Sequence, residues 1–532
     1  MRLSAVLLAF ALASPLAAQK APRPVTAPPK DLDAYVEQVM KEFGVPGLAL
    51  AVVKDGKVVV AKGYGVRHLG EPAKVDAQTQ FGIASNTKVF TAVALGTLVE
   101  QGKLEWDKPV IDYLPWFAMY DPFVTRELTI RDLLVHRSGF GLGAGDLLWW
   151  PASTYDRKEI SRRLRYIKPA TSFRSAYAYD NVLYSVAGEV IETVSGRTWE
   201  DYVQQEILAK VGMTHSGVRH SDAGNGGNVA ATHAKVEGVL KPVAPMVSDN
   251  TNPAGGINAG AEDMARWLLV MADSGKLADG SRLYSPRTAR QLWSIVTPLG
   301  TGSAPPHLAP LSRNFRGYGL GLFLQDYRGV MVATHTGGLP GYVSEVTTVP
   351  SARLGVAVLT NAESGEAFAA ITWRIVDHFL GAKPFDWLGG FKRQRAIGDS
   401  MLAEQRKAAA ASRNASSKPS LPLAKYAGTY RDAWYGDMTI ALLRAEGASA
   451  GQAGAGGLTI KFERTPLLTG KLEHWQHDTF VARWTDRELR ADAFVTFALD
   501  PDGTIDTVKM RAVSPDTDFS YDFQDLVFRR IK

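Results

Sequence analysis

Apolar residues recur at helical spacing in four stretches of the first part of the chain. The stretch from Leu32 to Phe43 predicts an amphipathic helix, as do residues 260–274 and 367–380. A fourth helix is predicted from Val182 to Ser195, where Gly196 provides the stop that glycine commonly gives.

Short apolar runs predict strands at both ends of the same region. Residues 48–53 and 58–61 flank Lys54-Asp55-Gly56-Lys57, whose Asp-Gly pair predicts a tight hairpin turn. Three later runs also predict strands: 318–322, 330–334 and 356–359. Strands at both ends with helices between them indicate an α+β domain over residues 31–385, with one sheet and a helical lobe.

The character of the chain changes after residue 385. Residues 386–422 join a charged, Ala-rich stretch to a Ser/Pro-rich one, and predict a helical and polar linker. From 423 to 532, short apolar runs alternate with turns, which favours a small all-β antiparallel barrel or sandwich. The runs lie at 427–430, 438–443, 458–462, 479–484, 493–499 and 507–510.

The chain begins with the pattern of an export signal. A single Arg2, an apolar run and then small residues predict a signal peptide over 1–18, followed by a disordered Pro/Ala/Lys tail over 19–30. No later stretch reaches about 18 uninterrupted apolar residues, so no membrane-spanning helix is expected. We therefore expect an exported protein, periplasmic or secreted, of bacterial type.

Composition narrows the function classes. The chain has 60 basic and 54 acidic residues without a Lys/Arg run, so a nucleic-acid partner is not expected. It has no cysteine, which excludes a thiol nucleophile and argues against a structural zinc site. The absence of disulfides is compatible with export in a chain of 532 residues, which is long enough to bury a stable core.

A serine and a lysine three residues apart open a strongly apolar run. Ser85 and Lys88 would share one face of the first turn of a buried helix, so the hydroxyl and the amine can meet in one cavity. Burial would lower the pKa of Lys88 and let it take a proton. The plainer interpretation is a helix-capping serine followed by a surface lysine.

Two downstream segments supply the groups that a nucleophilic serine needs. Tyr179-Asp180-Asn181 precedes a predicted helix. We expect Tyr179 to accept the serine proton with its pKa lowered by Lys88, and Asn181 to hydrogen-bond Lys88 and a substrate amide. His335-Thr336-Gly337-Gly338 ends a predicted strand that can lie beside an extended substrate, with the Gly338 amide as an oxyanion donor.

The order Ser-x-x-Lys, Tyr-x-Asn, His-Thr-Gly resembles the three-motif layout of the penicillin-recognising serine hydrolases. The chain is similar to the branch with tyrosine in the second motif: class C β-lactamases, D,D-carboxypeptidases, D-aminopeptidases and family VIII esterases. The similarity covers roughly residues 31–385 and includes the surrounding runs 133–139, 255–256 and 337–342. It implies a β-lactamase/transpeptidase-like antiparallel sheet with a helical lobe.

The resemblance also implies the role of each motif residue, without a metal or an organic cofactor. Ser85 would be the acyl-forming nucleophile, Lys88 and Tyr179 the proton-transfer pair, Asn181, His335, Thr336 and Gly337 the substrate-binding residues, and the amides of Ser85 and Gly338 the oxyanion hole.

One departure bears on the substrate. Relatives that act as β-lactamases or D,D-carboxypeptidases usually begin the third motif with lysine, whereas His335 is largely neutral at pH 7 unless it is perturbed. D-aminopeptidases of this family carry histidine there and have C-terminal barrels. Residues 423–532 resemble the lipocalin-like domain of such hydrolases, especially at 426–430 and 472–475.

We therefore expect hydrolysis of a small peptide, amide or ester, including peptides with D-residues. A carboxylesterase, a weak β-lactamase and a slow-turnover penicillin-binding sensor stay open as alternatives. The sequence leaves the stereochemistry, the oligomeric state and the role of the barrel undecided, although the barrel could project a loop into the active site.

Overall fold

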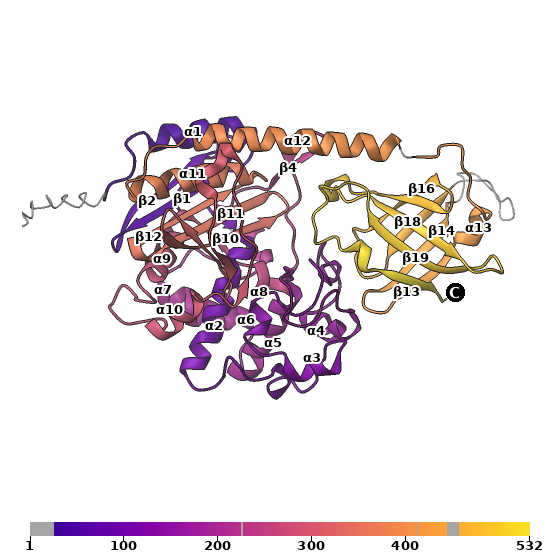
Figure 1. The fold of residues 1–532 in the computed structure, drawn as a ribbon, viewed down its shortest axis with the longest axis horizontal. Helices are drawn as coiled ribbons and strands as arrows, with labels where there is room; N and C mark the ends of the chain where they lie inside the picture. The colour runs from indigo at the N-terminus through magenta and orange to yellow at the C-terminus, as the bar shows by residue number, and fades with distance from the viewer. Residues whose placement is uncertain (1–25, 225–226, 412, 444–456, 532) are drawn as a thin grey trace, which may run out of the picture.

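The computed structural model describes residues 26–224, 227–411, 413–443 and 457–531, and shows two domains bridged by one long helix (Figure 1). The predicted signal peptide, residues 1–18, lies outside the described residues. The predicted fold class, an α+β domain followed by an all-β barrel, is confirmed.

The first domain is built on an antiparallel sheet of eight strands. In spatial order these are β2 (Lys57–Gly65), β1 (Gly47–Lys54), β12 (Leu354–Thr360), β11 (Tyr342–Val349), β10 (Val330–Leu339), β9 (Phe323–Tyr327), β8 (Arg316–Tyr318) and β7 (Thr297–Pro298). The first and last parts of the domain meet at the centre of this sheet, because β1 pairs with β12.

Both faces of this sheet are covered, which explains why every residue of β1 and β12 is buried. Alternate side chains of β1 belong to different apolar clusters: Leu48, Leu50 and Val52 to one, and Ala49, Ala51 and Val53 to the other. Helices α1 (Leu32–Phe43) and α11 (Gly365–Phe379) cover the first face, and α9 (Ala261–Ala272) covers the second.

The helical lobe is inserted between β2 and β7, and α2 (Lys88–Glu100) lies at its centre. Every residue of α2 from Lys88 to Leu98 is buried, as expected for a helix that is apolar on all sides. Between β2 and β7 the chain also forms α3 (Pro122–Glu127), α4 (Arg157–Arg163), α5 (Val182–Ser195), α6 (Trp199–Tyr202), α7 (Ala209–Val211), α8 (Asn252–Gly255) and α10 (Pro286–Leu292), and the strand pairs β3 (Phe81–Gly82) with β6 (Asn258–Ala259) and β4 (His233–Val236) with β5 (Val239–Pro242).

The C-terminal domain is a closed antiparallel barrel of eight strands. They are β13 (Gly428–Asp432), β14 (Gly436–Leu442), β15 (Leu458–Phe462), β16 (Thr469–Gln476), β17 (Thr479–Trp484), β18 (Ala493–Leu499), β19 (Ile505–Ala512) and β20 (Val527–Arg530). The rings of Trp484, Phe523 and Phe528 lie 5.7–6.5 Å from the ring of Phe462, and all four are buried, so aromatic side chains occupy the interior. Its likeness to lipocalins stays a prediction.

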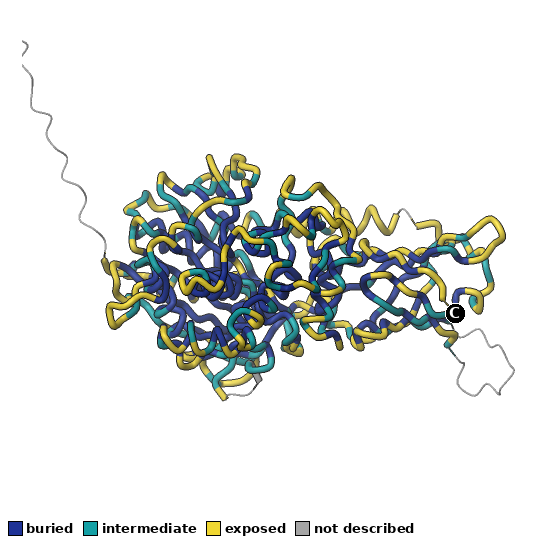
Figure 2. Tube along the Cα trace, turned by 90° about the horizontal axis from the view of Figure 1, so that it is seen from below, coloured by how far each residue is buried: buried dark blue, intermediate teal, exposed yellow. Residues whose placement is uncertain are grey.

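The stretch predicted as a linker is largely a helix that begins inside the first domain. Helix α12 (Trp387–Ala411) packs Trp387, Gly390 and Phe391 against that domain, and its later turns are exposed (Figure 1 and Figure 2). The short helix α13 (Leu423–Tyr426) then precedes the barrel. Among the described helices, none has both the length and the apolar composition needed to cross a bilayer.

Three expectations for the described residues were wrong or incomplete. Of the predicted strand 318–322, only Tyr318 is in a strand, at the end of β8; residues 319–322 are the turn to β9, where Gly321 takes a left-handed backbone (φ 76°). Residues 26–30, assigned to a disordered tail, are held by a hydrogen bond from Leu32 N to Pro29 O and a contact between His378 and Ala27. Strands β16 and β20 were not predicted.

The barrel is fixed against the first domain by hydrogen bonds at both ends of the contact. On the lobe side, the Thr154 amide donates to Arg464 O (2.8 Å) and the Arg163 guanidinium donates to Trp434 O (2.9 Å). On the sheet side, Arg490 of the barrel forms a bidentate ion pair with Glu363 (2.6 and 2.7 Å). The barrel therefore has a defined place beside the lobe.

Candidate active site

Ser85 lies in a 3₁₀ turn, η1 (Ala84–Thr87), directly before α2. The preceding Ala84 has φ of 51°, a left-handed conformation that is rare for alanine and is typical of strained functional turns. Strand β10 lies against this turn, where a Cβ on Gly337 would come within 2.2 Å of Ile83 O. Glycine is thus required for β10 to approach the half-buried Ser85.

Lys88 is fully buried and aimed at Ser85. Its Nζ lies 3.0 Å from Ser85 Oγ, 2.7 Å from Asn181 Oδ1 and 3.0 Å from Ala254 O. Burial lowers the pKa of Lys88 to about 7, against the opposing effect of the nearby Asp146 and Asp180 carboxyls. A lysine with this pKa can exist as a neutral amine near pH 7, which is the form that accepts a proton.

Tyr179 completes the group around the serine. Its hydroxyl hydrogen-bonds Ser85, and Lys88 Nζ lies 4.8 Å from the centre of its ring. Burial raises the pKa of Tyr179 well above its usual value, so the free site holds a neutral phenol. This corrects the expectation that Lys88 lowers the tyrosine pKa: the phenol is a proton donor in the free site, and Lys88 is the available base.

Asn181 stands directly before α5 and uses both ends of its side-chain amide inside the protein. The oxygen accepts from Lys88, and the nitrogen donates to Asp146 Oδ2 (2.8 Å). The predicted contact with Lys88 is present, and the side-chain nitrogen is bound to Asp146. Asn181 therefore links the lysine to a carboxyl that sequence reasoning did not select.

The third motif forms the end of β10. His335 is buried between Tyr318, whose hydroxyl lies 2.9 Å from Nε2, and Thr336 O at 2.5 Å from Nδ1. Burial lowers the pKa of His335 to about 3, so the ring is neutral. Thr336 and Gly338 are exposed beside Ser85's turn, and a Cβ on Gly338 would meet no atom within 4 Å. The structure thus brings all the predicted site residues together.

Asp146 lies behind Asn181, and the barrel reaches it. Asp146 accepts from Trp149 Nε1 (3.0 Å) and Asn181 Nδ2 (2.8 Å), and also from Ser520 Oγ of the barrel at 2.9 Å. Burial raises the pKa of Asp146 to about 7, although these hydrogen bonds oppose the rise. No motif in the sequence singled out Asp146.

The same barrel loop, residues 513–525 between β19 and β20, makes two further contacts. The ring of Phe519 lies 5.9 Å from that of Tyr179, edge to face. The Asp522 carboxylate accepts from the backbone amides of Gly145 (2.7 Å) and Leu147 (3.0 Å). The described residues contain no cluster of three or more histidine, cysteine or acidic side chains able to hold a metal ion.

Comparisons with known proteins match both domains. A family model described as beta-lactamase matches residues 32–380, and one described as a domain of unknown function (DUF3471) matches residues 412–530. The unguisins hydrolase ungD of Aspergillus violaceofuscus is 28% identical over 507 residues, which are 89% of this chain and 86% of that protein.

Two solved structures share the fold. The octameric penicillin-binding protein homologue from Pyrococcus abyssi has a TM-score of 0.56 at 20% identity, over 94% of this chain and 99% of that one. A D-stereospecific amidohydrolase from Streptomyces has a TM-score of 0.50 at 21% identity, over 66% of this chain and 99% of that one.

Proposed function

This chain belongs to the β-lactamase family, and from that premise we propose that it is an exported serine hydrolase that cleaves small peptide, amide or ester substrates through an acyl-enzyme. The observation that carries the proposal is the contact of 3.0 Å between Ser85 Oγ and the buried Lys88 Nζ. A serine becomes nucleophilic when a neighbouring base removes its proton, and burial gives Lys88 that capacity.

In the first step, Ser85 Oγ bonds to the substrate carbonyl carbon while its proton passes to Lys88 Nζ. The carbonyl electron pair moves to the oxygen, which the backbone amides of Ser85 and Gly338 stabilise. The exposed end of β10 at Thr336 and Gly338 holds the substrate in an extended form beside this centre.

In the second step, the bond to the leaving nitrogen or oxygen breaks and the acyl group stays on Ser85. Tyr179, a neutral phenol, donates its proton to the leaving group and regains one from the Lys88 ammonium. Water then attacks the acyl carbon while Tyr179 and Lys88 take up its proton and return a proton to Ser85 Oγ. The bond between the acyl carbon and Ser85 Oγ breaks, which releases the acid and restores the serine hydroxyl.

The neutral His335 favours substrates that do not need a cationic partner at this position. The similarity to a D-stereospecific amidohydrolase and to an unguisins hydrolase supports amide bonds, including those of D-residues, as the preferred target. The apolar run at residues 3–12 supports export.

The test compares rates on p-nitrophenyl acetate, a cephalosporin, and D- and L-alanyl p-nitroanilides, with Ser85→Ala as the control. We expect ester and D-anilide turnover that Ser85→Ala abolishes, and an acylated Ser85 in intact-mass spectra of quenched reactions. A protein that is acylated once and never turns over would instead be a sensor. Equal rates for the wild type and Ser85→Ala would refute the mechanism.

A further inference from the structure

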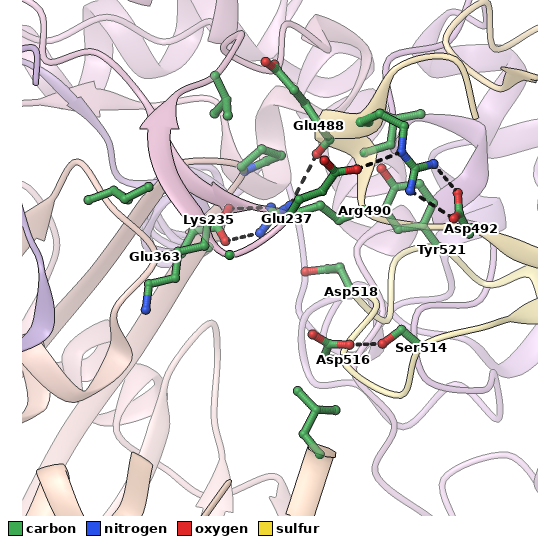
Figure 3. Close-up of a pocket in the computed structure, with 18 of the residues that line it drawn as sticks. Lys235, Glu237, Glu363, Glu488, Arg490, Asp492, Ser514, Asp516, Asp518 and Tyr521 are labelled. Atoms are coloured by element: carbon green, nitrogen blue, oxygen red, sulfur yellow. Dashed lines mark hydrogen bonds and ion pairs between the residues drawn. The ribbon is translucent and has the colours of Figure 1, made fainter. Parts of the chain in front are cut away.

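A large cleft separates the first domain from the barrel, with a volume of about 1220 Å³. Its walls are the β4–β5 hairpin on one side and the barrel rim around Arg490 and Tyr521 on the other, and α12 contributes residues such as Leu402 (Figure 3). The cleft is thus built by both domains together.

The cleft reaches the end of β10, next to the catalytic centre. Gly338, Leu339 and Pro340, at the end of the strand that borders Ser85, line it. The barrel loop 513–525 also lines it, through residues such as Asp518 and Tyr521, and the same loop touches Tyr179 through Phe519. A chain that leaves the catalytic centre along β10 at Gly338 therefore enters this cleft.

The charge of the cleft is opposite to that of the whole protein. Nine carboxylate side chains and six cationic ones line it, while the chain as a whole carries a formal charge of +6. Five of the six cations already form ion pairs with carboxylates of the cleft: Arg395 with Glu366, Arg406 with Asp516, Arg483 and Arg487 with Asp492, and Arg490 with Glu363. Of the other five carboxylates, Glu237 pairs with Arg487 and Glu488 pairs with Lys241. Asp399, Asp486 and Asp518 therefore provide the negative surplus of the cleft.

We propose that this interdomain cleft binds the part of a peptide substrate that extends beyond the scissile bond, and that it prefers segments bearing cationic side chains or a free amino group. The inference rests on the proposed peptide hydrolysis and adds the substrate class. The cleft is large enough for several residues of a peptide. Apolar side chains that line it, such as Leu402 and Phe494, can pack against the alkyl stems of the peptide's cationic side chains.

Binding can be tested without turnover in the Ser85→Ala protein. The probes are fluorescein-labelled hexapeptides with an Ala-Ala centre and flanks of lysine, glutamate or serine, followed by fluorescence anisotropy. We expect the lysine peptide to bind about tenfold more tightly than the glutamate peptide, with a ratio that shrinks as salt is raised to about 0.5 M. Equal affinities at low salt would overturn the proposal.

A second pair of variants tests the location. Leu402 lines the cleft, whereas the adjacent Met401, 56% exposed, does not. In the Ser85→Ala background, Leu402→Trp should weaken binding of the lysine peptide about fivefold or more by filling the cleft, and Met401→Trp should not. Equal effects of the two substitutions would place the peptide elsewhere.

The two proposals fail in different ways. Turnover of p-nitrophenyl acetate requires only the centre around Ser85, so it tests the proposed function without the cleft. The absence of ester turnover by the wild type would refute the proposed function. Peptide binding that depends neither on the charge of the peptide nor on Leu402→Trp would refute only the proposed role of the cleft.

Discussion

Replacing Ser520 with alanine tests whether a residue of the barrel positions the catalytic lysine. Ser520 Oγ donates to Asp146 Oδ2, the same oxygen that receives Asn181 Nδ2, and Asn181 Oδ1 in turn accepts from Lys88. The substitution removes one of the three donors to Asp146, because Trp149 and Asn181 remain. It removes no group of the first domain.

The size of the expected loss in kcat/KM follows from the burial of the hydrogen bond between Ser520 and Asp146. A hydrogen bond to a charged group contributes about 1.5–3 kcal/mol, and Ser520 and Asp146 are both buried. Because two donors to Asp146 remain, we expect the activation free energy to rise only by the lower end of that range. This rise corresponds to a loss of about tenfold in kcat/KM. A loss of stability of about 1 kcal/mol should accompany it.

The pH profile separates positioning from general destabilisation. The Ser520 hydrogen bond lowers the pKa of Asp146, so its loss makes that carboxyl more protonated. Ionised Asp146 raises the pKa of Lys88, and a more protonated Asp146 therefore lets Lys88 lose its proton at lower pH. The rising limb of kcat/KM against pH should shift to lower pH, even though the maximum falls.

The assay is p-nitrophenyl acetate hydrolysis between about pH 5 and 9, with Ser514→Ala as the matched control. Ser514 lies in the same loop but its hydroxyl contacts Asp516 and Arg406, away from Asp146. We expect Ser514→Ala to match the wild type. If Ser520→Ala also matches it in rate and in pH profile, the barrel does not position the lysine.

Other outcomes follow from the same structure. Ser85→Ala should abolish turnover while thermal unfolding stays within a few degrees of the wild type; residual hydrolysis would point to another nucleophile. In the wild type, kcat/KM should rise as pH passes about 7, where Lys88 loses its proton, and a flat profile from pH 5 to 9 would contradict a lysine base. Gly337→Ala should lower both the melting temperature and kcat/KM, the latter by about tenfold or more, because its Cβ would collide with Ile83 O; unchanged kinetics would show that β10 can move at no cost. Burial raises the pKa of Glu345 to about 7, so this residue contributes stability that is complete below the unfolded pKa and is lost as pH rises through about 7. The unfolding free energy of Glu345→Gln, relative to that of the wild type, should therefore increase between pH 5 and pH 8 by an amount on the order of 2 kcal/mol, which thermal unfolding at the two pH values measures. A stability difference between the two proteins that does not change with pH would refute the raised pKa.

Local signals were sufficient for much of the fold. The helices Leu32–Phe43 and Val182–Ser195 have the predicted bounds, because amphipathic periodicity and the glycines that end them are properties of adjacent residues. The Asp55-Gly56 hairpin also forms as predicted, with φ of 51° and 77° at its two central residues. Strand β16 was missed because only two of its eight residues, Gly470 and Leu472, are buried, and β20 because it has only four residues.

Only the site residues that belong to a sequence motif could be predicted. Ser85, Lys88, Tyr179 and the His335 strand stand in recognisable patterns, and the structure places them together. The contact between Asp146 and Ser520 joins residues 374 positions apart, and neither belongs to a motif. Such a pairing depends on how two domains dock, which periodicity and spacing do not encode.

The hydrogen bonds between Asp522 and the amides of Gly145 and Leu147 constrain how such enzymes can be recombined. A chimera cut within residues 386–422 would keep the strands of each domain together and yet exchange the acceptor of the two buried amides. Each amide left without an acceptor costs about 1–3 kcal/mol, comparable to a large share of the stability of an ordinary domain. Donor barrels should therefore be chosen for an acidic residue at this loop position, and segments 141–150 and 513–525 should be inherited as one unit.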